Sequence, residues 1–213
     1  MTRFKICCIG SEKEAIMATG YGASAIGLVG KMPSGPGPIE DRLIMNIARI
    51  VPPMISTFLL TSETTATAII GHHKKTLTNT IQLVDSVDRS EYQYLRKEIP
   101  AIKLVQVIHV MSEASVEEAV MISEYADAIL LDSGNPGLAI KELGGTGRIN
   151  NWKLSRKIVE QVSIPVILAG GLNPSNVRQA IDEVQPFAVD VCSGLRTEGC
   201  LDEAKLEKFC MAL

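Results

Sequence analysis

Short apolar segments alternate with longer amphipathic ones along the whole chain, and this alternation limits the fold more than any other feature of the sequence. The apolar segments are rich in β-branched residues, as expected for strands buried on both faces. The segments between them carry apolar residues at helical spacing. Ser11 and Asn173 are in position to cap the first and seventh helices, with Pro174 at the first position of the seventh. The predicted strands are residues 4–9, 24–29, 54–60, 80–84, 102–110, 128–131, 164–169 and 187–191, and the predicted helices are residues 12–19, 39–50, 63–73, 90–98, 115–125, 152–162, 174–184 and 202–213.

Strands that alternate with helices pair in parallel through right-handed crossovers. Eight such units predict an α/β protein that forms a single (β/α)8 TIM barrel over residues 1–213, with parallel strands inside and helices outside. The length of 213 residues is near the lower limit for that barrel. A doubly wound open sheet is the alternative, but it gives no reason for two glycine-rich turns near the C-terminus.

Those two turns follow the seventh and eighth predicted strands. Gly170 and Gly171 end the seventh strand, and Ser193 and Gly194 follow the eighth. Free backbone N–H groups at such turns can hold a dianion, and the loops after strands seven and eight of a (β/α)8 barrel form a phosphate site. Glycine needed only for turn geometry is the alternative explanation of either turn alone. Together, the two turns predict a phosphorylated ligand.

Composition excludes several other classes of protein. The chain is 46% hydrophobic and 21% charged, as in soluble globular proteins, and its net charge of −3 without a basic cluster argues against a nucleic-acid partner. No run of 18 apolar residues and no leader segment occurs, so we expect no membrane partner. The five cysteines include the adjacent pair Cys7 and Cys8, which favours a reducing cytoplasm over a disulfide framework. Cysteines and histidines show no metal-site spacing, so we expect no metal.

The first strand carries a candidate catalytic thiol. Catalytic side chains of a barrel lie at the carboxyl ends of its strands. Alternation places Lys5 and Cys7 on one face of the strand and Ile6 and Cys8 on the other. If Ile6 and Cys8 pack against the helices, Cys7 points into the barrel mouth, where a thiolate can act as base or nucleophile. A small buried hydrophobic residue is the alternative role for a lone cysteine.

Two aspartates end or interrupt apolar strands. Asp132 ends the sixth predicted strand and opens a long loop rich in glycine. A carboxylic acid at a barrel mouth can donate a proton when burial or a nearby phosphate raises its pKa, although a loop-capping aspartate is the alternative. Asp190 lies within the eighth strand and must be paired or near the mouth, because an isolated buried carboxylate is costly.

Five segments, in order, share their sequence with one known family. They are KIC at 5–7, LLD at 130–132, GGTG at 144–147 with Trp152 downstream, AGGLNPSNV at 169–177 and PFAVDVCSG at 186–194. In these segments the chain closely resembles the phosphoribosylanthranilate isomerases of tryptophan biosynthesis. The similarity covers nearly the whole chain in order and spacing.

This resemblance implies a (β/α)8 barrel that catalyses the Amadori rearrangement of an aminoaldose phosphate to an aminoketose phosphate without a cofactor. By position, Cys7 corresponds to the base that removes the proton from the sugar carbon next to the Schiff base. Asp132 corresponds to the acid that protonates the furanose ring oxygen. A phosphorylated small molecule is the expected partner of a monomer or homodimer. The predicted phosphate- and substrate-binding residues are Lys5, Gly144, Gly145, Gly147, Gly170, Gly171, Asp190, Ser193 and Gly194.

Two positions depart from the family pattern, both at the aromatic end of the expected substrate. Where the family carries an arginine that grips the anthranilate carboxylate, this chain has Gly35, with Lys31 as the nearby cation. Where the family has QLH, the chain has Gln-Leu followed by Val84. Three hypotheses follow: a phosphoribosylanthranilate isomerase, a relative that isomerises another phosphorylated amino sugar or aldose, or a non-catalytic phosphate-ligand-binding barrel. The retained Cys7 and Asp132 argue against the third, whereas Gly35 and Val84 favour the second over the first.

Overall fold

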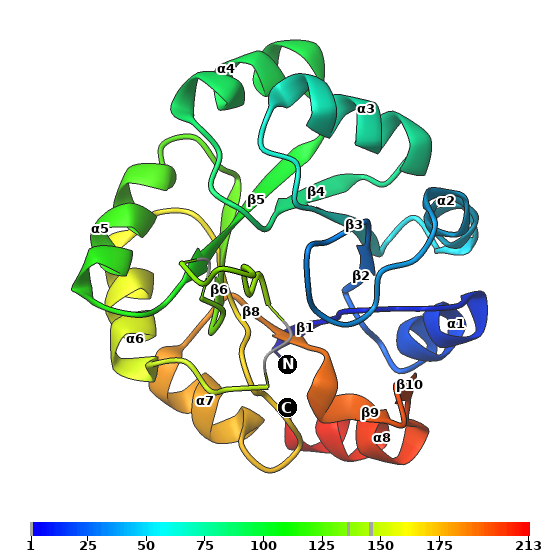
Figure 1. The fold of residues 1–213 in the computed structure, drawn as a ribbon. Coiled ribbons are helices and arrows are strands. Elements are labelled where there is room, and N and C mark those ends of the chain that lie inside the picture. The colour runs from blue at the N-terminus through cyan, green and yellow to red at the C-terminus, as the bar shows by residue number, and fades with distance from the viewer. Residues whose placement is uncertain (1, 136, 145–146) are drawn as a thin grey trace.

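Eight parallel strands form a closed barrel in which each strand pairs with the next in chain order and the eighth pairs with the first (Figure 1). The computed structural model describes residues 2–135, 137–144 and 147–213. The strands are β1 (Arg3–Ile6), β2 (Ala25–Val29), β3 (Ser56–Thr61), β4 (Thr80–Leu83), β5 (Lys103–His109), β6 (Ala128–Asp132), β7 (Val166–Leu168) and β8 (Ala188–Val191). The predicted (β/α)8 fold is confirmed, and the open-sheet alternative is wrong.

A ring of helices covers the outside of the barrel (Figure 1). Serine, threonine, asparagine or aspartate side chains accept a backbone hydrogen bond at the starts of several of them, including Ser11 at the first. The helices are α1 (Glu12–Gly20), α2 (Asp41–Ile50), α3 (Ala66–Thr76), α4 (Arg89–Glu98), α5 (Glu113–Ile122), α6 (Trp152–Gln161), α7 (Val177–Val184) and α8 (Glu203–Ala212). Within the described residues, no helix has the length and apolar character needed to cross a membrane.

Alternation along the strands divides the buried side chains between two cores. In β6, Ile129 and Leu131 belong to the larger core between strands and helices, whereas Ala128 and Leu130 belong to the core inside the barrel. Each fully buried aliphatic side chain contributes about 1.5–3 kcal/mol relative to an exposed one. Because the side-chain period of a strand is two, Asp132 at the end of β6 faces the inside of the barrel.

The first strand ends earlier than its apolar sequence predicts. β1 stops at Ile6, and Cys8 has a left-handed backbone with φ 61°. This conformation ends the strand alternation, so both Cys7 and Cys8 belong to the core inside the barrel. Ile6 packs toward the helices as expected. The prediction that Cys8 also packs there is wrong, because it assumed that the strand continues through it.

The seventh helix also begins later than predicted. Its N-cap is Asn176 rather than Asn173. The side chain of Asn173 instead accepts a hydrogen bond from Ser175 N (2.8 Å), and its carbonyl accepts one from Asn176 N (3.2 Å). Asn176 returns a side-chain hydrogen bond to Gly171 O (3.0 Å). The asparagine that looked like a helix cap therefore closes a separate turn, which fixes the backbone just after β7.

A short hairpin, absent from the predicted pattern, follows β8. The 3₁₀ turn Ser193–Leu195 leads into the antiparallel strands β9 (Arg196–Thr197) and β10 (Cys200–Leu201). The residues between these strands are Glu198 and Gly199, both with positive φ, which is the conformation that a two-residue hairpin turn requires. The hairpin matters for the site because it positions Arg196.

Candidate active site

A pocket opens at the carboxyl ends of the barrel strands, and we call it the mouth pocket. Its empty volume is about 710 Å³, including space open to solvent. The pocket is lined by Cys7, Cys8, Val29, Met32, Ser34, Gly35, Pro36, Leu60, Gln82, Val84, Leu130, Asp132, Leu143, Gly144, Gly147, Ala169, Gly170, Gly171, Leu172, Asp190, Cys192 and Ser193. Most of the predicted site residues therefore share one pocket.

A buried ion pair lies below the pocket. Lys5 Nζ is 2.8 Å from Asp190 Oδ2, and the two residues are 2% and 6% exposed. Burial alone would lower the pKa of Lys5, but the adjacent Asp190 carboxylate outweighs burial and the net pKa is raised. The lysine is therefore an ammonium, and it also lies 5.3 Å from the centre of the Phe58 ring. Asp190 lines the pocket, whereas Lys5 supports it from beneath.

Cys7 lies just above this ion pair. A Cβ added to Gly27 of β2 would lie 2.9 Å from Cys7 Sγ and 3.1 Å from Lys5 Nζ, so the missing side chain makes room for both groups. Cys7 N donates to Val191 O of β8 (2.8 Å). Its carbonyl accepts a hydrogen bond from Arg196 Nη2 (3.3 Å). The backbone of Cys7 is thus held by β8 and by Arg196, and Cys7 lines the pocket.

Arg196 is a supporting residue that the sequence does not reveal. Its guanidinium donates to the carbonyls of Cys7 and Cys8 and pairs with Glu14 at 3.1 Å. Glu14 in turn accepts from Leu201 N (2.8 Å). This cluster ties the turn after β1 to the hairpin after β8. No local motif indicates the contact, because the residues are far apart in the sequence.

Asp132 enters the pocket from β6 and is only 8% exposed. Its Oδ1 accepts a hydrogen bond from Ser133 N (2.8 Å). Gly144, with φ 139°, packs over the carboxylate, and a Cβ there would lie 2.6 Å from Asp132 Oδ2. Burial raises the pKa of Asp132; the Ser133 N–H and the positive charges of His109 and Lys5 limit this rise without cancelling it. A buried carboxyl group with a raised pKa is suited to donate a proton.

His109 is the neighbour of Asp132 on the adjacent strand. The two residues are paired in the register of β5 and β6. Burial lowers the pKa of His109, although Asp132 opposes that change. Its Nε2 lies 3.4 Å from Val84 O, and its buried Nδ1 has no hydrogen-bond partner within the described chain. A lone histidine at a strand end is a weak sequence signal, and only the strand register brings it to Asp132.

The glycine-rich segments predicted to bind phosphate converge on one side of the pocket. A Cβ on Gly171 would lie 2.8 Å from Gly147 O, and one on Gly147 would lie 3.7 Å from Ser193 Oγ. Gly170 and Gly171 have φ values of 87° and 62°, which other residues rarely adopt. A Cβ on Gly194 would lie 2.9 Å from Asn173 Cβ. These positions require glycine for close backbone approach, while Gly145, also predicted to bind, lies outside the described residues.

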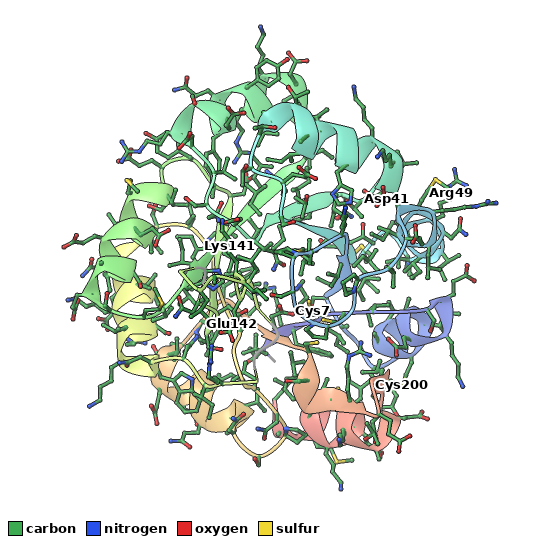
Figure 2. The ribbon with its side chains drawn as sticks, in the orientation of Figure 1. Cys7, Asp41, Arg49, Lys141, Glu142 and Cys200 are labelled. Atoms are coloured by element: carbon green, nitrogen blue, oxygen red, sulfur yellow. The ribbon has the colours of Figure 1, made fainter. Side chains whose placement is uncertain are left out.

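The opposite side of the pocket is formed by the loop after β2 and the end of β4. Gly35 has φ 98°, and Val84 is 2% exposed and lines the pocket. Lys31 is exposed and is not among the lining residues. Ser34 Oγ donates to the carbonyl of Lys141 (2.5 Å), so the loops after β2 and β6 meet above the pocket. Figure 2 shows Lys141 over the middle of the barrel, where its ammonium pairs with Asp85 at 2.5 Å.

Fold and site together define a (β/α)8-barrel enzyme with its chemistry at the carboxyl ends of the strands. Residues 63–212 match a family model described as N-(5'-phosphoribosyl)anthranilate (PRA) isomerase. N-(5'-phosphoribosyl)anthranilate isomerase 2 of Methanosarcina mazei is 39% identical over 209 residues, which cover 97% of this chain and 92% of that protein. The chain therefore belongs to the N-(5'-phosphoribosyl)anthranilate isomerase family, and it is an isomerase. The resemblance noted in the sequence is confirmed.

Solved structures agree with this assignment. One is a phosphoribosylanthranilate isomerase in complex with reduced 1-(o-carboxyphenylamino)-1-deoxyribulose 5-phosphate; it is 27% identical, with a TM-score of 0.82, and the match covers 100% of this chain and 98% of that one. Another is a monomeric form of the dimeric phosphoribosylanthranilate isomerase from Thermotoga maritima, 26% identical with a TM-score of 0.82 over the same shares of the chains. Relatives of this chain thus include one that binds a phosphorylated ligand and one that is dimeric.

Proposed function

We propose that this chain catalyses the Amadori rearrangement of N-(5'-phosphoribosyl)anthranilate to 1-(2-carboxyphenylamino)-1-deoxyribulose 5-phosphate, with Asp132 as general acid and Cys7 as general base. One observation carries the proposal: a buried carboxyl group with a raised pKa and a thiol line the same pocket from β6 and from the end of β1. The reaction needs both a proton donor and a proton acceptor, and the chain's own side chains supply them.

Asp132 opens the sugar ring in this mechanism. Its carboxyl proton passes to the furanose ring oxygen as the bond from that oxygen to C1 breaks, which leaves a Schiff base between C1 and the anthranilate nitrogen. The raised pKa of Asp132 keeps a larger fraction of the group protonated than an exposed aspartate would keep. Gly144 packs over the carboxylate and limits the access of water to it.

Cys7 completes the isomerisation. Its thiolate removes the proton from C2 of the Schiff base, and the resulting enol amine tautomerises to the ketone. The ammonium of Lys5 lies next to the space that Gly27 leaves for Cys7 Sγ, so it faces the negative charge of the thiolate. Arg196 fixes the backbone of Cys7 through its carbonyl.

The substrate phosphate binds in the proposed complex at the turns after β7 and β8. The backbone N–H groups of Gly171, Ser193 and Gly194 have no protein acceptor among the described residues. Such groups, gathered where several chain segments approach closely, suit a dianion. Gly147 belongs to the same cradle because its backbone contacts the turn at Gly171. Gly145 remains part of the proposal on sequence grounds alone.

The same proposal extends to partners and compartment. The partner is a phosphorylated small molecule, without nucleic acid or membrane, and the protein acts as a monomer or homodimer without a cofactor. The odd number of cysteines and the adjacent pair Cys7 and Cys8 favour a reducing compartment, and we propose the cytoplasm.

A relative that isomerises another phosphorylated amino sugar is the second candidate function. Gly35 and Val84 support it, because neither residue offers a charged group to an anthranilate carboxylate. The pocket wall at these positions is instead formed by backbone and apolar side chains.

Turnover of freshly prepared N-(5'-phosphoribosyl)anthranilate by the purified protein tests the proposal, followed through the loss of anthranilate fluorescence. We expect turnover by the wild type and its loss in Cys7→Ala, with circular dichroism to verify that the variant is folded. An inactive wild type that still binds inorganic phosphate would instead support the relative with a different aglycone. Equal turnover by wild type and Cys7→Ala would contradict the assigned base.

A further inference from the structure

Two cysteines that the proposed reaction does not use lie against each other in the mouth pocket. Cys192 Sγ is 2.7 Å from Cys8 Sγ, although the residues are 184 positions apart in the sequence. This separation is far shorter than ordinary packing of two sulfur atoms and approaches the about 2.05 Å of a disulfide bond. Both side chains line the pocket.

The position of Cys8 is strained and closely covered. Its φ of 61° lies in the left-handed region, which is unfavourable for a residue with a Cβ. A Cβ added to Gly37 would lie 2.7 Å from Cys8 Cβ and 3.1 Å from its Sγ, so the loop after β2 packs directly onto the side chain. A strained residue held by its surroundings is a feature of functional sites. The backbone therefore aims this thiol at Cys192 and leaves it little freedom to turn away.

Cys192 is the more reactive member of the pair. It is partly exposed, whereas Cys8 is buried. The hydrogen bond with Cys8 lowers the pKa of Cys192, and the nearby guanidinium of Arg196 acts in the same direction. The pKa of Cys8 is raised, chiefly by the hydrogen bond to Cys192. Arg196 Nε is buried without a partner among the described residues, so this guanidinium retains a donor for negative charge.

We propose that Cys8 and Cys192 are a reversible modification site, at which a two-electron oxidant such as hydrogen peroxide joins them by a disulfide bond. The Cys192 thiolate attacks one oxygen of the peroxide; an S–O bond forms, the O–O bond breaks, and the leaving hydroxide takes a proton to become water. The Cys8 sulfur then attacks the resulting sulfenic sulfur as its proton passes to the leaving oxygen. The S–S bond forms as the S–O bond breaks and a second water leaves. Two thiols thus lose two electrons and two protons, and peroxide becomes two waters.

The bond would join the two sides of the proposed catalytic site. Cys8 follows the proposed base Cys7, and Cys192 precedes Ser193 of the proposed phosphate cradle. Oxidation therefore links the turns after β1 and β8 covalently. We expect this to lower turnover reversibly, and this expected effect rests on the proposed function. The covalent bond itself does not depend on that function.

The test treats the full chain with hydrogen peroxide, blocks remaining thiols with iodoacetamide and digests with trypsin without reductant. Mass spectrometry is expected to show the peptide of residues 6–13, with its other cysteine alkylated, joined to that of residues 179–196. The joined species should be lighter by two hydrogens than the sum of these two peptides and should be separated by dithiothreitol. Because the first peptide contains two cysteines, variants identify the partner. The link should persist in Cys7→Ser and disappear in Cys8→Gly and in Cys192→Ser; glycine adopts the positive φ at position 8 without strain.

Cys200→Ser is the matched control, because Cys200 is exposed and lies at the outer edge of the barrel, away from Cys7 (Figure 2). This variant should form the link as the wild type does. A link that persists in Cys8→Gly but vanishes in Cys7→Ser would overturn the proposal, as would sulfinic or sulfonic acid at Cys192 without any link. In a parallel assay, peroxide should lower wild-type turnover at least tenfold, whereas Cys8→Gly, measured against its own untreated rate, should resist. A link without a change in turnover would keep the modification site but overturn its effect on the reaction.

Discussion

Asp132 and Asp190 are both buried aspartates that line the mouth pocket, but their surroundings differ. They are 8% and 6% exposed. Asp190 has the Lys5 ammonium at 2.8 Å. Asp132 has no ion pair among the described residues and accepts a hydrogen bond from the N–H of Ser133. Burial raises the pKa of each; the Lys5 ammonium opposes this rise through its charge and a hydrogen bond at Asp190, but through its charge alone at Asp132.

The difference separates a proton donor from a structural charge. A carboxyl group without a counter-ion gains from being protonated when it is buried, and so it can give its proton to a substrate. A carboxylate paired with a buried lysine is held ionised, and its main role is to keep the lysine from being an isolated charge. We therefore expect substitutions at the two aspartates to change different measured quantities.

The largest effect is expected for Asp132→Asn, on turnover. The amide keeps the shape of the side chain but cannot donate a comparable acid proton, so kcat should fall by roughly 10²–10⁴-fold. Substrate affinity should stay within a few-fold, because the phosphate cradle is unchanged. Steady-state kinetics measure kcat. Equilibrium binding of reduced 1-(o-carboxyphenylamino)-1-deoxyribulose 5-phosphate measures the affinity. A variant that retains the wild-type rate would remove Asp132 from the role of acid.

The fold of this protein follows from local patterns in the sequence. Apolar strand segments, helix-capping residues and the spacing of strand–helix pairs are all local, and they are sufficient to predict eight units that close into a barrel. The errors occur where conformation depends on a contact or a special backbone angle. The left-handed Cys8 ends β1 early, and Asn173 closes a turn instead of capping a helix.

The site is predictable only in part, for the same reason. Strand ends bring Cys7, Asp132 and Asp190 to one pocket, and strand position in the sequence is enough to expect this. The partner of Asp190, the support from Arg196 and the contact between Cys8 and Cys192 join residues that are about 180 to 190 positions apart. Such contacts depend on barrel closure between β8 and β1, which no local pattern encodes.

The second prediction concerns Asp190→Asn, for which we expect a loss of stability. The amide leaves the Lys5 ammonium buried without a counter-charge, which should cost about 3–5 kcal/mol in the free energy of unfolding. The double variant Lys5→Met, Asp190→Leu replaces the pair with apolar side chains and should recover most of that loss. Urea unfolding of wild type, single and double variants measures this. If Asp190→Asn is as stable as the wild type, Asp190 is not the group that keeps Lys5 charged.

The third prediction concerns the pH dependence of stability. Because the pKa of Asp132 is raised on folding, the native state keeps a proton that the unfolded state releases, and this stabilisation is lost as pH rises through the folded-state pKa. Asp132→Asn has no carboxyl group at this position and therefore lacks this pH-dependent stabilisation. Its unfolding free energy relative to wild type should therefore increase from pH 4 to pH 8, with a slope of at most about 1.4 kcal/mol per pH unit. Urea unfolding at several pH values measures the difference, and a difference independent of pH would contradict an unpaired, protonated Asp132.

The smallest effect is expected for His109→Gln, which tests whether Asp132 acts alone. Burial lowers the pKa of His109, so a smaller fraction of this imidazole carries a positive charge beside the carboxyl group than of an exposed histidine. The glutamine amide can replace its contact with the carbonyl of Val84. We therefore expect kcat/KM at pH 7 to stay within about tenfold of wild type, which corresponds to about 1.4 kcal/mol. If kcat instead falls as far as in Asp132→Asn, His109 and Asp132 donate the proton as a pair. The difference between Asp132 and Asp190 would then depend on His109 as much as on the absence of a paired lysine at Asp132.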